Sequence, residues 1–236
     1  MPVAAFMSSA NQPIKVDIWS DIACPWCYIG KRKFEAGSGL FAGAGEGRGV
    51  EIEYHSFELS PDTPVDFEGN EAAFLASHKG IPEAQAQQMI DRVTEIAASV
   101  GLAYDYDNLK HTNTVLAHEA IHFAKAHGKQ LEMTERLLSA YFLEARHVGK
   151  VDELAALGAE IGLDPVALTA ALESHEFLDA VRRDQQTAVE YGIQGVPFFV
   201  IDGKYGVSGA QEAQSFARVL EQVWSVRDTA DEEVSA

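Results

Sequence analysis

The hydrophobic pattern of this chain changes period twice, and that change limits the folds it can adopt. Apolar and polar residues alternate at 15–20 and 50–59, which is typical of strands. From about 62 to 174 the apolar residues recur at helical spacing instead. Strand character returns at 196–201, and an Asp-Gly turn predicts a hairpin with 205–207. This order predicts one shared sheet interrupted in sequence by an all-helical insertion.

Helices are also expected among the strand segments. One should follow the first strand and run to about Leu40. A second is expected to begin with Ser174 as its N-cap, and a third should extend from Gln211 to Trp224. Together with the strands, these helices predict an α/β fold.

Composition excludes several classes of function. The chain has 236 residues, of which 18 are Lys or Arg and 36 are Asp or Glu, so its formal net charge is −18. Such a surface repels nucleic-acid phosphates and anionic lipid, so we expect neither as a partner. No apolar run approaches the ~18 residues that a membrane-spanning helix needs. The first residues do not have the pattern of a secretion signal, and a cytoplasmic location is expected.

The two cysteines, Cys24 and Cys27, stand in a C-x-x-C motif directly after the first predicted strand. Two cysteines cannot form the framework of a disulfide-stapled fold, so chemistry is the better explanation. At a helix N-terminus, free backbone N–H groups and the helix dipole favour a thiolate on Cys24. Cys27, one turn later, can attack a mixed disulfide on Cys24. Pro25 suits the first helical turn because it lacks an N–H group.

Four segments of the sequence carry a family resemblance. They read VDIWSDIACPWCYIGK at 16–31, SFELSP at 56–61, NTVLAH at 113–118 and YGIQGVPFFVIDGKY at 191–205. Together they resemble the DsbA family of thioredoxin-fold thiol–disulfide oxidoreductases, in particular its cytoplasmic FrnE-like branch. The resemblance implies a thioredoxin-like domain at 14–61 and 175–227, a helical insertion subdomain at 62–174, and loose tails at 1–13 and 228–236.

The resemblance also implies a substrate groove between the two parts of the molecule. Val196 would present its backbone to a substrate peptide. Pro197 would follow a cis bond and pack against the disulfide, and Pro25 would lie beside the groove. The partners implied are protein or peptide thiols and disulfides, with glutathione as a further candidate. We expect no metal and no cofactor, because the dithiol itself carries the redox equivalents.

Four other side chains near these motifs each have two interpretations. Trp26 can face the groove or the core, and its place between the cysteines favours the groove. Phe57 can be a core residue or, as the resemblance implies, lie near the active site. Asn113 can cap its helix or line the groove. Asp21 is expected to be a turn residue, although a carboxylate there could also tune the thiolate.

Two alternative functions remain open at this stage. The main alternative is a glutathione-dependent transferase or isomerase of the related kappa-class branch, in which a serine stands where Cys24 does. The presence of both cysteines favours redox chemistry. The outside alternative is a zinc hydrolase, because His118 to His122 match the H-E-x-x-H pattern. A helical wheel places His118 and His122 opposite the apolar face, so we expect them on a solvated face without metal.

Overall fold

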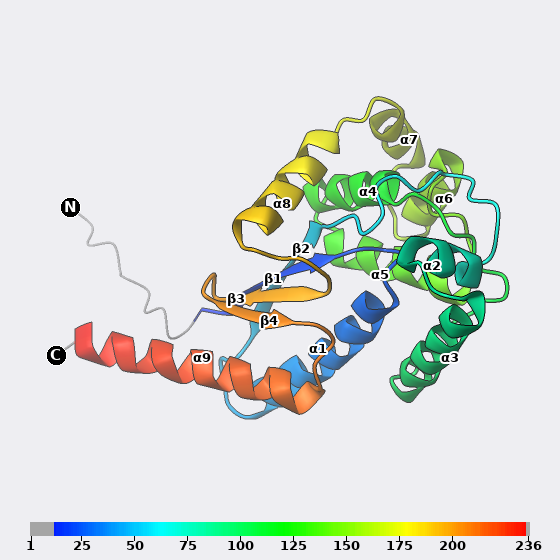
Figure 1. Ribbon diagram of the computed structural model, residues 1–236. Helices are drawn as coiled ribbons and strands as arrows, with labels where there is room; N and C mark the ends of the chain where they lie inside the picture. Colours follow the sequence, from blue (N-terminus) through cyan, green and yellow to red (C-terminus); the bar gives the residue numbers. More distant parts are fainter. Residues whose placement is uncertain (1–11, 235–236) are drawn as a thin grey trace.

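The computed structural model describes residues 12–234 and shows one sheet with helices on both faces (Figure 1). The strands are β1 (Ile14–Ser20), β2 (Val50–Ser56), β3 (Phe198–Ile201) and β4 (Tyr205–Ser208). They lie in the order β2-β1-β3-β4, with β1 parallel to β2 and antiparallel to β3. The expected α/β fold, with the first and last parts of the chain in one sheet, is thereby confirmed.

One face of the sheet is covered by α1 (Pro25–Gly43) and α9 (Ala213–Val234). The apolar side chains that alternate along β1 point to this face and are almost fully buried. The two helices approach each other closely at Gly37. A Cβ atom there would lie 2.6 Å from the Ala213 carbonyl oxygen and 2.7 Å from Phe216 Cβ. Glycine is therefore required at this position for the two helices to pack.

The opposite face carries α8 (Leu178–Glu190), which lies along the sheet near β2 (Figure 1). Trp19 from β1 is buried here together with Val200 and Ala188. Its indole N–H donates a hydrogen bond of 3.0 Å to the Asp184 carbonyl oxygen. This contact joins the first strand to a helix that lies more than a hundred residues later in the chain.

The predicted insertion, which the structure describes in full, contains helices joined by loops and no strand, and it lies between β2 and α8 in the chain (Figure 1). Its helices are α2 (Glu71–Lys79), α3 (Glu83–Ser99), α4 (Val115–Ala126), α5 (Gln130–Leu143), α6 (Val151–Glu160) and α7 (Pro165–Glu173). The hydrophobic core of the insertion also includes Ile22, from the loop after β1, and Tyr28 and Ile29, from the start of α1. The insertion therefore packs directly on the segment that carries the two cysteines. None of the helices within residues 12–234 is long and apolar enough to cross a bilayer.

Two predicted boundaries differ from the structure. Ser174 ends α7 as its C-cap, and its hydroxyl donates to the Ala170 carbonyl oxygen; α8 begins only after Phe177. The reason is the left-handed backbone of His175, which stops the helix. Helix α9 continues to Val234, because neither glycine nor proline interrupts it. The prediction of a loose tail at 228–236 is therefore wrong for 228–234. The tail predicted at 1–13 lies mostly outside the described residues.

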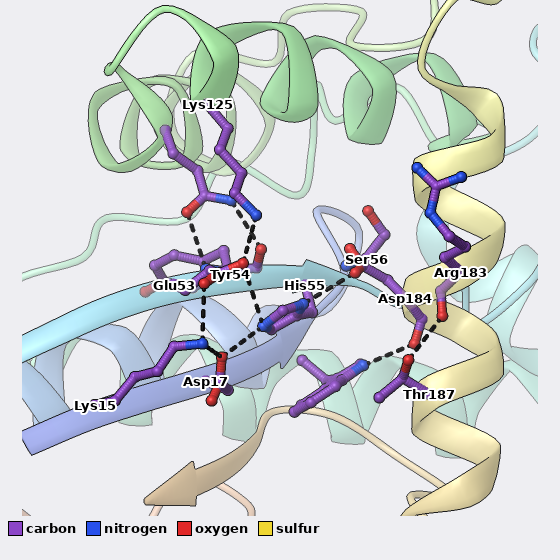
Figure 2. A network of polar contacts seen from close by, with 12 residues as sticks. Lys15, Asp17, Glu53, Tyr54, His55, Ser56, Lys125, Arg183, Asp184 and Thr187 are labelled. Atoms are coloured by element: carbon purple, nitrogen blue, oxygen red, sulfur yellow. Dashed lines mark hydrogen bonds and ion pairs between the residues drawn. The ribbon is translucent and has the colours of Figure 1, made fainter. Parts of the chain in front are cut away.

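A network of partly buried charges ties β1, β2 and α8 together (Figure 2). The two ring nitrogens of His55 lie 2.8 Å from Asp17 Oδ1 and 2.9 Å from Asp184 Oδ1. The ring also stacks on Trp19, with 4.4 Å between the ring centroids. Burial alone would lower the pKa of His55, but the hydrogen bonds to Asp17 and Asp184 outweigh it and raise the pKa to about 9. His55 is therefore a partly buried cation that bridges two carboxylates.

This bridge predicts a pH-dependent contribution to stability. Because the pKa of His55 is raised from 6.5 to about 9, its contribution is complete below about pH 6.5 and is lost as the pH rises through 9. His55→Asn should lower the free energy of unfolding by up to about 3 kcal/mol at about pH 6, and by much less at about pH 10. Urea unfolding followed by circular dichroism at both pH values measures this.

The matched control for this prediction is His78→Asn, because His78 is exposed and has no ion pair within the described residues. It should show no comparable pH-dependent loss. A destabilisation by His55→Asn that is equal at the two pH values would contradict the cationic bridge.

Candidate active site

Cys24 lies between the end of β1 and the start of α1. It is the N-cap of this helix, with an extended backbone, and Pro25 occupies the first helical position. The Cys24 N–H donates to the Asp21 carbonyl oxygen at 3.2 Å, and the Cys27 N–H donates to the Cys24 carbonyl oxygen at 3.0 Å. The predicted strand–C-x-x-C–helix arrangement is thus present, with the second cysteine one turn into the helix.

The two thiols have different surroundings. Cys24 lines a cavity of about 330 Å³, and its Sγ lies 3.6 Å from the Val196 carbonyl oxygen. Both cysteines are almost fully buried, at 3% and 2% exposed, but Cys27 does not contribute to the cavity wall. Burial and the neighbouring Cys24 raise the pKa of the Cys27 thiol, although the Ser20 hydroxyl and the Asp21 N–H act in the opposite direction. Cys24 is therefore the thiol that an entering molecule meets first.

The cavity lies between the cysteine motif and the helical insertion. Residues of the motif form one wall, and the opposite wall comes from α2, α3 and the segment that leads into α4. Its lining includes Pro25, Trp26, Leu59, Phe74, Met89, Val93, Tyr106 and His111. The Tyr104 hydroxyl donates to the Pro25 carbonyl oxygen at 2.7 Å, which joins the two walls. Trp26 is 41% exposed in this wall, as the groove-facing interpretation predicts.

Val196 and Pro197 lie on another side of Cys24. The bond between them is cis, as the family resemblance implies. A Cβ atom on Gly30 would lie 2.9 Å from Pro197 Cγ, so proline packs closely on α1. The structure therefore brings Cys24, Cys27, Val196 and Pro197 together. Neither Val196 nor Pro197 lines the cavity on the insertion side.

Phe57 and Asn113 lie outside the wall of this cavity. Phe57 packs against the buried cluster around Trp19, in keeping with its interpretation as a core residue. The Asn113 side-chain oxygen accepts a hydrogen bond from the Val115 N–H at 2.9 Å, and its amide group donates to the Pro61 carbonyl oxygen. Asn113 therefore shapes the turn before α4, but the N-cap of this helix is Thr114, so the helix-cap interpretation of Asn113 is wrong by one residue.

The expectation that His118 and His122 lie on a solvated face is wrong. Helix α4 is buried on all sides between Ala117 and Ala124, and the two histidines are 1% and 7% exposed. His118 Nε2 lies 3.3 Å from Asp21 Oδ1, and His122 Nε2 lies 3.0 Å from Asp184 Oδ2. The sequence pattern could not reveal this, because the partners are acidic residues far away in the chain.

Asp21 has a larger role than that of a turn residue. It is 1% exposed, and its Oδ2 accepts a hydrogen bond of 2.8 Å from the Leu59 N–H. Burial would raise the pKa of its carboxyl group, but the hydrogen bond and charge of His118 outweigh this effect and the pKa is lowered. A buried carboxylate thus holds the loop before Cys24 against α4.

Side chains of the types that ligate metals come together on β1 and β2, outside the cavity. Among the described residues, Asp17, Glu53 and His55 offer ligand atoms within 4.8 Å of one another. Lys15 Nζ already lies 3.0 Å from Asp17 and 3.2 Å from Glu53, and Lys125 also pairs with Glu53 (Figure 2). These ammonium groups neutralise the carboxylates. Each of the three residues of the H-E-x-x-H motif has its own partner. His118 and His122 lie beside Asp21 and Asp184, and Glu119 Oε1 lies 2.8 Å from His175 Nδ1.

Comparison with known proteins agrees with this geometry. Residues 15–221 match the family of DSBA-like thioredoxin domains. The uncharacterized protein YwbO of Bacillus subtilis (strain 168) is 30% identical over 210 residues, which cover 88% of this chain and 96% of that protein. The crystal structure of a probable DsbA oxidoreductase from Streptomyces coelicolor is 37% identical, with a TM-score of 0.83 and 90% of each chain covered.

A more distant structure shares the fold. The cytosolic disulfide reductase DsbM from Pseudomonas aeruginosa is 18% identical, with a TM-score of 0.63. The likeness covers 90% of this chain and 99% of that one. At this level of identity the likeness concerns the arrangement of helices and strands.

The different surroundings of the two thiols predict selective alkylation. In the reduced protein, iodoacetamide should modify Cys24 first and Cys27 several-fold more slowly, because only Cys24 lines the cavity and the pKa of the Cys27 thiol is raised. Peptide mass mapping over time measures both rates. The urea-unfolded protein is the control, in which both cysteines should react alike. Equal rates in the folded protein would contradict this assignment.

Proposed function

Because the chain belongs to the family of DSBA-like thioredoxin domains, we propose that it is a thiol–disulfide oxidoreductase that uses Cys24 and Cys27. The observation that carries this proposal is the unequal placement of the two thiols. Cys24 is the N-cap of a helix and lines a cavity, whereas Cys27 lies one turn further along the helix and does not line the cavity. One thiol is placed to meet a substrate, and the other is placed to meet only Cys24.

The reaction follows from this placement. The Cys24 thiolate attacks one sulfur of a substrate disulfide, so that a mixed disulfide forms and the other substrate sulfur leaves as a thiolate and takes up a proton. Cys27 then loses its proton and attacks Cys24 Sγ. The Cys24–Cys27 disulfide forms, and the second substrate thiol is released. Two electrons pass from the protein to the substrate, and the reverse sequence forms a substrate disulfide.

We propose reduction or reshuffling as the direction in the cell. The sequence predicts a cytoplasmic location, and the cytosolic glutathione pool keeps most dithiols reduced. A reduced Cys24–Cys27 pair can pass electrons to disulfides, and a thiol such as glutathione would then regenerate it. The alternative of a glutathione transferase or isomerase gives Cys27 no part in the chemistry, although it lies directly behind Cys24.

The cavity supports a small disulfide with an acidic group as substrate. Lys79 and Arg92 line it, are exposed and form no ion pair within the described residues. The acidic residues of the wall are already engaged: Asp21 is bound to His118, and Glu71 Oε2 lies 2.9 Å from His111 Nδ1. In a chain with a net charge of −18, the free charges at this cavity are therefore positive. Glutathione disulfide belongs to this chemical class.

The two cysteine roles predict different defects. Cys24→Ser should abolish reduction of a peptide disulfide, because the attacking sulfur is gone. Cys27→Ser should still attack but accumulate a mixed disulfide on Cys24, with turnover reduced at least about tenfold because the resolving thiol is missing. Intact-mass spectrometry after acid quenching identifies the adducts. Turnover retained by Cys24→Ser, or no adduct on Cys27→Ser, would contradict the mechanism.

The cationic cavity predicts charge selectivity, which two aromatic disulfides can test. The double substitution Lys79→Gln and Arg92→Gln should slow the reaction with anionic dithiobis-nitrobenzoate by up to about 30-fold, since each charge contributes at most on the order of 1 kcal/mol at contact distance in water. The reaction with uncharged dithiodipyridine should not change. Lys204→Gln, at an exposed site on the β3–β4 hairpin, is the matched control and should affect neither rate. Equal slowing of both reactions would refute charge selection.

A further inference from the structure

Glu71 is a buried carboxylate in the wall of the cavity that Cys24 also lines. It is the first residue of α2 and is 7% exposed. Its Oε2 lies 2.9 Å from His111 Nδ1, and a carboxylate only accepts, so the imidazole donates this hydrogen bond. His111 is 5% exposed and lines the same cavity. A carboxylate and an imidazole that are both more than nine-tenths buried therefore meet at this wall.

The imidazole of His111 is held in place from several sides. The Phe74 ring stacks on it with 3.5 Å between the ring centroids, and the Phe67 ring meets it edge-on at 5.5 Å. The Tyr141 hydroxyl oxygen lies 3.3 Å from His111 Nδ1. Because the imidazole is fixed, its hydrogen bond also fixes the carboxylate of Glu71. The orientation of this carboxylate is thus set before a ligand arrives.

The second carboxylate oxygen of Glu71 remains open. Within the described residues Oε1 forms no hydrogen bond, and the sealed side-chain atoms that lack a partner are Ser20 Oγ and Glu119 Oε2 instead. Glu71 Oε1 is therefore reached by solvent, and for a nearly buried residue of the cavity wall that solvent is in the cavity. The group that fits such an oxygen is an ammonium group or another N–H donor.

The same wall offers cations that fit a carboxylate. Lys79, two turns after Glu71 on α2, lines the cavity, and so does Arg92 on α3. Helix α3 returns beside α2 after a short turn, which puts Arg92 at the level of Glu71. Their neighbours Ala72 and Ile90 accordingly share one buried cluster. No ion pair joins Arg92 to Glu71 among the described residues, so each can bind a ligand group.

We propose that this wall selects disulfides that carry an α-amino acid group, with the ammonium group bound to Glu71 Oε1 and the carboxylate bound by Arg92 and Lys79. The inference rests on the proposed function and narrows its substrate class from acidic disulfides to zwitterionic ones. An α-amino acid carries both charges on one carbon atom, which matches an acceptor and a cation at the same level of two neighbouring helices. Cystine is the simplest disulfide of this class.

Three small disulfides separate the two charges. Cystine carries ammonium and carboxylate groups, dithiodipropionate carries only carboxylates, and cystamine carries only ammonium groups. Each is mixed with the reduced protein, the reaction is quenched with acid, and the remaining dithiol is alkylated with a maleimide and quantified by intact mass. The ratio of the variant rate to the wild-type rate for one disulfide does not depend on the intrinsic reactivity of that disulfide.

Glu71→Gln keeps the shape of the side chain and an oxygen for His111 but removes the charge. It should slow the reactions with cystine and cystamine about fivefold, as expected for the loss of one charge contact in water. It should not slow the reaction with dithiodipropionate. Glu119→Gln is the matched control, because Glu119 forms the same kind of pair with His175 at 2.8 Å but does not line the cavity. It should leave the relative rates of the three disulfides unchanged.

Wild-type rates provide a second test that does not depend on the folding of Glu71→Gln. When the rate with each disulfide is divided by its rate with dithiothreitol, the wild-type protein should prefer cystine to dithiodipropionate. The absence of this preference, or equal slowing of all three disulfides by Glu71→Gln, would overturn the zwitterion site alone. A wild-type protein that is oxidised neither by these disulfides nor by dithiodipyridine would overturn the proposed function.

Discussion

The carboxylate of Asp184 joins parts of the molecule that lie far apart in the sequence, and the active site depends on this junction. Its two oxygens receive hydrogen bonds from His55, the Ser56 N–H and His122, at 2.8–3.0 Å. These partners come from β2 and from α4. They hold the pKa of Asp184 well below its usual range despite burial, which alone would raise it. A partly buried charge with several donors is stable, whereas the loss of one partner is costly.

Asp21 forms a second junction of the same kind beside Cys24. It binds His118, which lies one turn before His122 on the same face of α4. Two histidines of the insertion thus reach two carboxylates of the sheet-bearing part, one from the loop after β1 and one from α8. These contacts set the position of the insertion relative to the cysteine motif. Since both parts contribute walls to the cavity, its shape follows from the same contacts.

Local patterns in the sequence were sufficient to predict the architecture. Alternation along β1 and β2 and helical spacing in the insertion are properties of neighbouring residues, and so is the strand–C-x-x-C–helix arrangement around Cys24. The buried pairs could not be predicted in this way. The helical wheel placed His118 among polar residues, because the wheel does not show that Asp21 approaches from another part of the chain.

The central claim is that Cys24 and Cys27 form one reversible two-electron couple. The direct test is to equilibrate the protein in glutathione buffers that range from reducing to oxidising, quench with acid, and record intact masses. The account predicts a single transition in which the protein loses two hydrogen atoms, and this transition should be absent in Cys24→Ser. A dithiol that persists across the whole range, or a stable glutathione adduct in place of the internal disulfide, would contradict it.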